Sequence, residues 1–220
     1  MATPPGTSLA SAVVTDEQAK AIAEASDFGA TVVAELSNLA RYIGRVFGTV
    51  PEDVVGLVLG DPLRAIRTVI AGKLDAKVQN ILAKRGVKET QPVSPSLGIP
   101  LLRAAYDESR AELQDLWAAL IAAAMDPARA DRVRLSFIET LKQFDPLDAM
   151  TLKLRTEGGH QILQPNAITY IAATLKISAD EVQISADNLW RLKCVDNSGE
   201  ASGNFLLTRY GHALLRACLD

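Results

Sequence analysis

The sequence has few aromatic residues, few cysteines and no excess of basic residues. Aromatic residues make up 5% of its 220 residues, and 23 Lys and Arg stand against 26 Asp and Glu, a net charge of −3. Without a positive balance the chain lacks the attraction to phosphates that general nucleic-acid binding needs. Its two cysteines, Cys194 and Cys218, stand in no CxxC or Cys/His spacing. No zinc motif is therefore visible, and a reduced, cytoplasmic protein is expected.

Long apolar runs are also missing. A helix that crosses a bilayer needs about 20 apolar residues, whereas the longest run here is Leu116–Met125, closed by Asp126 and Pro127. No basic segment leads into an apolar one at the N-terminus, so no signal peptide is expected. The run is rich in alanine, which lets neighbouring helices approach closely. It predicts a helix buried on most sides in a soluble bundle, with a partner interface as the alternative.

Residue patterns that carry chemistry are absent as well. The two histidines, His160 and His212, have no metal-ligand neighbour at helical spacing. There is no GxSxG motif, and GLVLGDPLR lacks the Gly-Lys-Ser/Thr ending of a phosphate-binding loop. Trp117 and Trp190 are expected to be core anchors and not platforms for bases. We expect no enzyme activity, no cofactor, no metal site and no small-molecule substrate.

The sequence does contain a mainly α-helical composition and a clear division along the chain. Residues 1–14 are rich in Pro, Thr and Ser and are expected to be disordered. Residues 15–144 are predicted to form a helical bundle domain. Residues 145–220 are predicted to form a small winged-helix domain, which combines helices with a β-hairpin.

Several helix boundaries can be predicted from local signals. Residues 15–18 (TDEQ) and 136–139 (SFIE) have the capping-box pattern. Asp61, followed by proline, predicts the N-cap of a helix that ends just before Gly86. The segment TQPVSPSLGIP predicts a loop, and the next helix is expected to start near Pro100.

The predicted helix after Asp61 carries the main concentration of positive charge. Residues 61–90 hold seven basic and three acidic residues. Lys73, Lys77 and Lys84 share one face of this helix, a pattern typical of a solvated surface. A stripe that binds a partner or a phosphate group is the alternative.

An amphipathic segment precedes this helix. Within residues 28–59, the stretch FGATVVAELSNLARYIGRVFG has apolar residues at helical spacing. We expect it to pack against the bundle. A membrane-surface or partner-binding helix is the alternative, but only Arg41 and Arg45 are basic there, so a membrane partner is disfavoured.

The C-terminal segment has the order of elements of a winged helix. Helices are predicted over 146–155, 164–175 and 178–193, and the last is opened by the capping box SADE. CVDNSGEASGNFLLT predicts a strand, a Gly- and Ser-rich wing and a second strand. A closing helix is predicted from Thr208. LTRYGHALL is similar to the LT-x-x-G segment that closes small bacterial winged-helix domains.

The charges on this segment disfavour DNA binding. A recognition helix should present basic or amide side chains to the major groove, but the third helix begins with Asp180 and Glu181. Gln183, Ser185 and Asn188 could still hydrogen-bond to bases. The wing tip, DNSGEASGN, holds two acidic residues and no Lys or Arg. We interpret the segment as a structural or protein-interaction module.

Five motifs in a fixed order carry a family resemblance. They are GDPLRAIR, ILAKRGV, IPLLRAAYDES, LQDLWAALIAAAMDP and SFIETLKQFDPLDAMTL, within residues 55–155. In this order they resemble the bacterial Abi-alpha family, whose members have a similar eLqdLWAnLLAnAmdP segment. The chain has Ala119 and Ala123 where the family often has Asn. The resemblance implies a part in abortive infection, in which an infected bacterium stops phage propagation, and it transfers no catalytic residues.

Three functions are compatible with these features. The favoured one is a non-enzymatic interaction protein of a phage-defence system, which binds a protein partner or a second copy of itself. The second is a DNA-binding transcriptional regulator that uses the winged helix. The third is a membrane-acting effector that uses residues 28–59.

Overall fold

The computed structural model describes residues 41–48, 64–157, 167–199 and 204–218, which are mainly α-helical with one small antiparallel sheet. Residues 41–47 form a helix. The elements that follow are α3 (Arg64–Lys84), α4 (Pro95–Tyr106), α5 (Ala111–Met125), the 3-10 helix η1 (Ala130–Arg132), α6 (Leu135–Leu141), α7 (Pro146–Glu157), α8 (Ala167–Leu175), α9 (Ala179–Arg191), β1 (Val195–Gly199), β2 (Asn204–Leu207) and α10 (Arg209–Cys218). The predicted fold class is confirmed.

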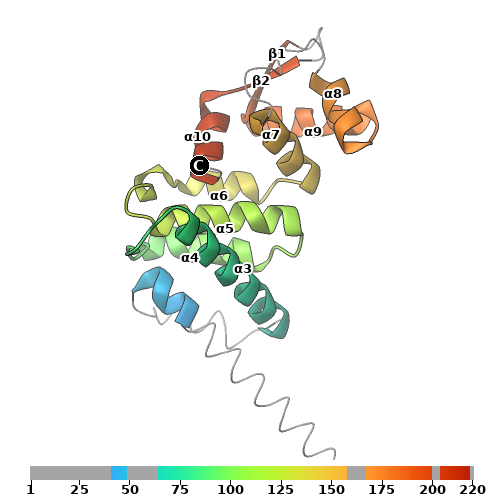
Figure 1. The fold of residues 1–220 in the computed structure, drawn as a ribbon. Helices are drawn as coiled ribbons and strands as arrows, with labels where there is room; N and C mark the ends of the chain where they lie inside the picture. Colours follow the sequence, from blue (N-terminus) through green and yellow to red (C-terminus); the bar gives the residue numbers. More distant parts are fainter. Residues whose placement is uncertain (1–40, 49–63, 158–166, 200–203, 219–220) are drawn as a thin grey trace, which may run out of the picture.

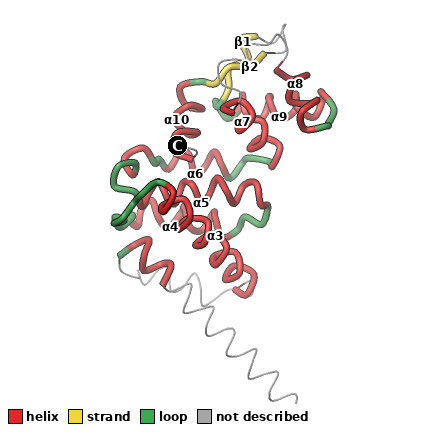
Figure 2. Tube along the Cα trace, in the orientation of Figure 1, coloured by secondary structure: helices red, strands yellow, loops and turns green. Residues whose placement is uncertain are grey.

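The helices fall into two groups. Figures 1 and 2 show α3, α4, α5 and α6 gathered in one part of the molecule, and α7, α8, α9 and the two strands in another. Helix α10 lies between them and packs against both α5 and β2. Within the described ranges, no helix combines the length and the apolar character that crossing a membrane requires.

Helix α5 forms the centre of the core. It packs against α3, α4, α7 and α10, and every residue from Leu116 to Met125 is buried. Alanine methyl groups along the helix allow its neighbours to pack close to the backbone. Trp117 is a core residue, as predicted. The apolar run is therefore a buried helix, and the prediction made for it is confirmed.

Two helix starts differ from the prediction. Helix α4 begins at Pro95 and continues through Pro100, because proline fits the first turn and burial of residues such as Leu101 outweighs the hydrogen bond that Pro100 cannot make. Helix α6 begins at Leu135, without a side-chain cap bond. Its start lies one residue before residues 136–139, so their predicted capping box is wrong.

Other boundaries agree with the sequence or lie outside the described residues. Helix α3 ends at Lys84 and is closed by Gly86, where φ is +69° and the N–H of Val87 donates to the carbonyl of Leu82 at 3.0 Å. This left-handed closure favours glycine. The predicted start of that helix at Asp61, the capping box at residues 15–18 and the disorder of residues 1–14 fall on undescribed residues.

The described part of the amphipathic segment packs against the bundle. The apolar side chains of residues 41–48, Tyr42, Ile43, Val46 and Phe47, are buried. A Cβ added to Gly98 on α4 would overlap the ring of Phe47, so glycine at this position lets the two helices meet. The remaining residues of the range 28–59 are not described.

A charged corner connects α4, α5 and α7. Glu108 is buried, and its carboxylate accepts hydrogen bonds from the backbone N–H and the guanidinium of Arg110 at 2.8 to 2.9 Å. Burial alone would raise the pKa of Glu108, but these hydrogen bonds and the charge of Arg110 bring it below its ordinary value of 4.5. Arg110 also reaches Asp145 at 3.3 Å, just before α7.

The C-terminal helices have the order that the sequence predicts. Lys176, with φ of +58°, makes the tight turn between α8 and α9. Ser178 and Glu181 form the predicted capping box. Strands β1 and β2 pair antiparallel, with Val195 opposite Leu207. The loop that holds His160 lies outside the described residues, and the assignment of this segment as a winged helix stays a prediction.

The LT-x-x-G segment closes the hairpin on the helices. The hydroxyl of Thr208 accepts a hydrogen bond from the N–H of Gly211 at 2.9 Å and donates to the carbonyl of Lys193 at 2.5 Å. A Cβ at Gly211 would overlap the backbone carbonyl of Cys194. Glycine therefore allows α10 to pack directly on the chain that enters β1.

Candidate functional site

A buried carboxylate joins α7 to α9. Asp148 accepts hydrogen bonds from the side chains of Ser185 and Asn188, both at 2.7 Å, and from the backbone N–H of Asp145 at 2.8 Å. Asp148 is almost fully buried, and these three donors offset the cost of removing its charge from water. Ser185 and Asn188 are thus engaged within the protein and are not presented to a base edge.

The outward side of α9 carries the most exposed apolar side chains of the helix. Ile184 is 69% exposed and Trp190 is 54% exposed. The expectation that Trp190 is a core residue is wrong, because α9 turns Val182 and Leu189 toward the core instead. We define the α9 outer face as Asp180, Ile184, Asp187 and Trp190, which appear below by this name.

The α9 outer face is negatively charged. Asp180 and Asp187 are exposed, and Asp187 accepts a hydrogen bond from Gln183 at 2.8 Å. The basic residue in the last turn, Arg191, donates to the side chains of Gln143 at 3.1 Å and Asn188 at 2.6 Å. Large apolar side chains flanked by carboxylates favour a basic, partly apolar surface over a phosphate backbone.

The three lysines of the predicted stripe have different surroundings. Lys77 donates to the carboxylate of Asp115 at 2.6 Å and so connects α3 to α5. Lys73 and Lys84 are exposed and have no partner among the described residues. Leu74, Val78 and Leu82, on another side of α3, are buried. A partner- or phosphate-binding role for Lys73, Lys77 and Lys84 stays a prediction.

The described residues with potential for catalysis are dispersed or buried. No three His, Cys, Asp or Glu side chains within the described ranges lie close enough together to hold a metal ion. Cys194 and Cys218 are free thiols, and burial raises the pKa of each to about 12. Both are therefore protonated at neutral pH and are poor nucleophiles. The absence of enzyme activity stays a prediction.

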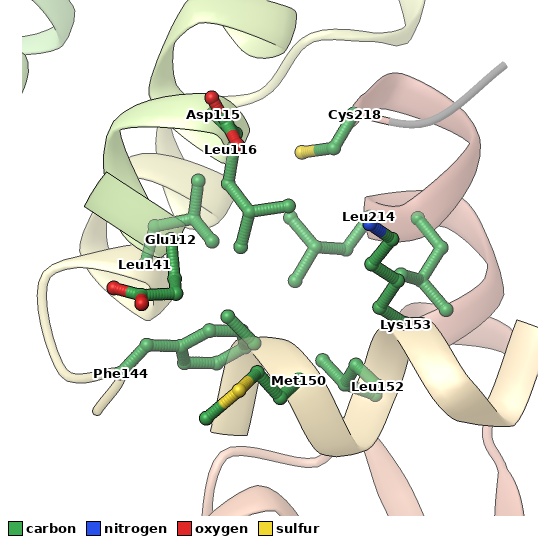
Figure 3. A pocket seen from close by; sticks show the side chains of 12 residues that line it. Glu112, Asp115, Leu116, Leu141, Phe144, Met150, Leu152, Lys153, Leu214 and Cys218 are labelled. Carbon is green, nitrogen blue, oxygen red and sulfur yellow. The ribbon is translucent and has the colours of Figure 1, made fainter. Parts of the chain in front are cut away.

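A cavity of about 330 Å³ lies where α5, α6, α7 and α10 meet. Figure 3 shows the apolar side chains around it converging from these helices, and they include Leu116, Leu141, Phe144, Leu152 and Leu214. Glu112, Asp115 and Lys153 lie at its edge. This volume is at the lower end of the range for small-molecule sites, which begins at roughly 300 Å³.

Comparison with protein-family models identifies the family of this chain. The model of one family, abortive infection alpha, matches residues 70–218. The chain belongs to the abortive infection alpha family. The match runs from α3 to α10 and therefore includes the C-terminal segment, beyond the residues 55–155 that carry the sequence resemblance. No curated protein and no solved structure matches the chain. Membership of this family suggests a role in abortive infection.

Two features of these surfaces differ from or add to what the sequence predicts. The exposure of Trp190 could have been anticipated, because Ile184, Asp187 and Trp190 lie on the opposite side of α9 from Val182 and Leu189. The cavity could not, since its walls come from helices far apart in the sequence and each wall residue has the character of an ordinary core residue.

Proposed function

We propose that the chain is a non-enzymatic interaction protein of an abortive-infection system, and that it binds a protein partner through the α9 outer face. The observation that carries this proposal is the exposure of Ile184 and Trp190 on a helix that also presents Asp180 and Asp187. Exposed apolar groups rimmed by polar ones are typical of interaction sites, and Trp is enriched among the residues that dominate binding.

Charge complementarity indicates the chemistry of the partner. An apolar recess on the partner would receive Ile184 and Trp190, and burial of their exposed apolar surface would favour binding by roughly 25 cal/mol per Å². Lys or Arg residues around that recess would face Asp180 and Asp187. The partner is thus a protein with a basic, partly apolar surface.

The hypotheses of a DNA-binding regulator and of a membrane-acting effector have weaker support. Of the three α9 residues that could hydrogen-bond to bases, Ser185 and Asn188 are engaged with Asp148, and Gln183 donates to Asp187 at 2.8 Å. In the described part of residues 28–59, the apolar side chains of residues 41–47 are buried in the core and would have to leave it to contact a membrane. Binding through either of these sets of side chains therefore needs a rearrangement, whereas protein binding at the α9 outer face does not.

Phage plating tests the defence role. Bacteria that express the chain with its native neighbouring genes are compared with an empty-vector strain across a diverse phage panel. We expect fewer plaques and early death of infected cells. Unchanged plaques across the panel would remove the defence role.

A second measurement separates protein binding from DNA binding. Fluorescence anisotropy with labelled duplex DNA is recorded at about 50 mM and about 200 mM salt. We expect no increase in anisotropy at either concentration. Binding that weakens steeply with salt would favour the regulator instead.

A further inference from the structure

The cavity between α5, α6, α7 and α10 carries an inference that the proposed function does not include. Its walls are apolar and almost fully buried at Leu141, Phe144, Leu152 and Leu214. They come from both groups of helices, since α5 and α6 belong to the first group and α7 to the second. A molecule in this space would contact both groups at once.

The charged side chains at the edge of the cavity differ in whether they have a partner within the protein. Asp115 is paired with Lys77 on α3 at 2.6 Å, and Lys153 on α7 is engaged in an interaction of its own. Glu112, one turn before Leu116 on α5, has no hydrogen-bond or ion-pair partner among the described residues. The unbalanced group at the edge is therefore a carboxylate.

We propose that this cavity binds a small cationic amphiphile, with its apolar body between α5, α7 and α10 and its positively charged group beside Glu112. The apolar walls would take a hydrocarbon chain or ring, because burial of apolar surface favours such a ligand. The carboxylate of Glu112 favours a ligand whose polar end is positively charged. Cys218 lines the same space as a neutral, protonated thiol and adds to the apolar wall.

Three simple probes test this assignment on the chain of residues 1–220. Decylamine, decanol and decanoate share one apolar chain and differ in the charge of the end group. We expect decylamine to bind most tightly in calorimetric titrations and to raise the melting temperature, since a ligand of the native state stabilises it. Decanoate binding more tightly than decylamine, or no binding of any probe, would overturn the proposal.

Two variants and a matched control locate the site. Ala149→Leu places a larger side chain in the cavity wall, and we expect it to weaken decylamine binding by more than about tenfold. Glu112→Gln should weaken decylamine binding by about fivefold, the effect of one exposed ion pair, and leave decanol unchanged. Glu89→Gln, an exposed control that does not line the cavity, should leave both unchanged. Equal affinity in all three variants would contradict the assignment.

Methionine NMR supplies a readout that does not depend on how the variants fold. Met150 lines the cavity, whereas Met125 is buried in α5 and does not. In the wild-type protein with labelled methionine methyl groups, decylamine should shift the Met150 signal and leave the Met125 signal in place. An unmoved Met150 signal at saturating probe would overturn the proposal.

Discussion

Helices α5 and α9 differ in where they place their apolar side chains. Helix α5 has the longest apolar run of the sequence, and all of Leu116–Met125 is buried. Helix α9 has many charged and polar residues, yet it leaves Ile184 and Trp190 exposed. A strongly apolar helix buries its apolar surface within the protein's own core. Isolated apolar side chains on a polar helix face stay exposed and are available to a partner.

The family match is consistent with this contrast. It covers both helices, but they contribute in different ways. Helix α5 packs against four other helices and fixes their arrangement. Helix α9 uses its inward polar residues, Ser185 and Asn188, to hold α7 and leaves its outer face open. The first helix therefore specifies the fold, and the second provides the candidate binding surface.

The largest effect is expected from enlarging a small residue in α5. Ala122→Leu adds volume at a fully buried position, and overpacking of this kind costs about 3 kcal/mol. Chemical denaturation should show this loss in the free energy of unfolding. The matched control is Ala83→Leu on the exposed side of α3, which should change stability by less than about 0.5 kcal/mol. Similar effects of the two changes would contradict the central position of α5.

The next effect concerns the connection between α7 and α9. Asp148→Ala leaves the donors of Ser185, Asn188 and Asp145 without their acceptor, and we expect a loss of about 2 kcal/mol. Thermal melting by circular dichroism measures it. Asp131→Ala, at an exposed position in η1, is the control and should melt close to wild type. An unchanged melting temperature for Asp148→Ala would show that this network is unimportant for stability.

A smaller, pH-dependent effect is expected at the α4–α5 corner. The folded-state pKa of Glu108 is lowered from 4.5, so its stabilising contribution is present above that pH and is lost as the pH falls through the folded pKa. Glu108→Gln should cost about 1 kcal/mol at pH 7, measured by urea denaturation. The difference from wild type should disappear as the pH is lowered well below 4.5, and a difference that grows in acid would contradict the assigned pairing with Arg110.

The smallest effect on stability is expected on the α9 outer face. Trp190→Ser removes a side chain that is 54% exposed, and a surface change of this kind alters the free energy of unfolding by about 0.5 kcal/mol or less. Thermal melting measures it. A loss in the free energy of unfolding as large as that of Ala122→Leu would mean that Trp190 stabilises the core and is not a free binding residue.

Much of the fold followed from local signals in the sequence. The buried run in α5, the glycine closure at Gly86 and the Ser178 capping box depend on neighbouring residues only, and the structure confirms them. The start of α4 at Pro95 did not follow, because the packing that outweighs Pro100 comes from distant residues.

The candidate sites were harder to anticipate for the same reason. The acidic character of α9 was visible in the sequence, but the engagement of Asn188 with Asp148 depends on how α7 and α9 meet. The cavity is lined by residues of α5, α7 and α10 that lie far apart in the sequence, and no local pattern encodes their meeting. The three-lysine stripe was visible, but the pairing of Lys77 with Asp115 was not.

The central claim is that the α9 outer face binds a protein partner. Its most direct test compares exposed apolar residues on α9 with an exposed apolar residue on α6. Phage plating is measured for the wild type, for Ile184→Ser and Trp190→Ser, and for Leu135→Ser, which changes a 52% exposed residue on α6. If α9 binds the partner, the two α9 variants lose protection at normal protein levels while Leu135→Ser keeps it. Full protection by Ile184→Ser and Trp190→Ser would contradict the account.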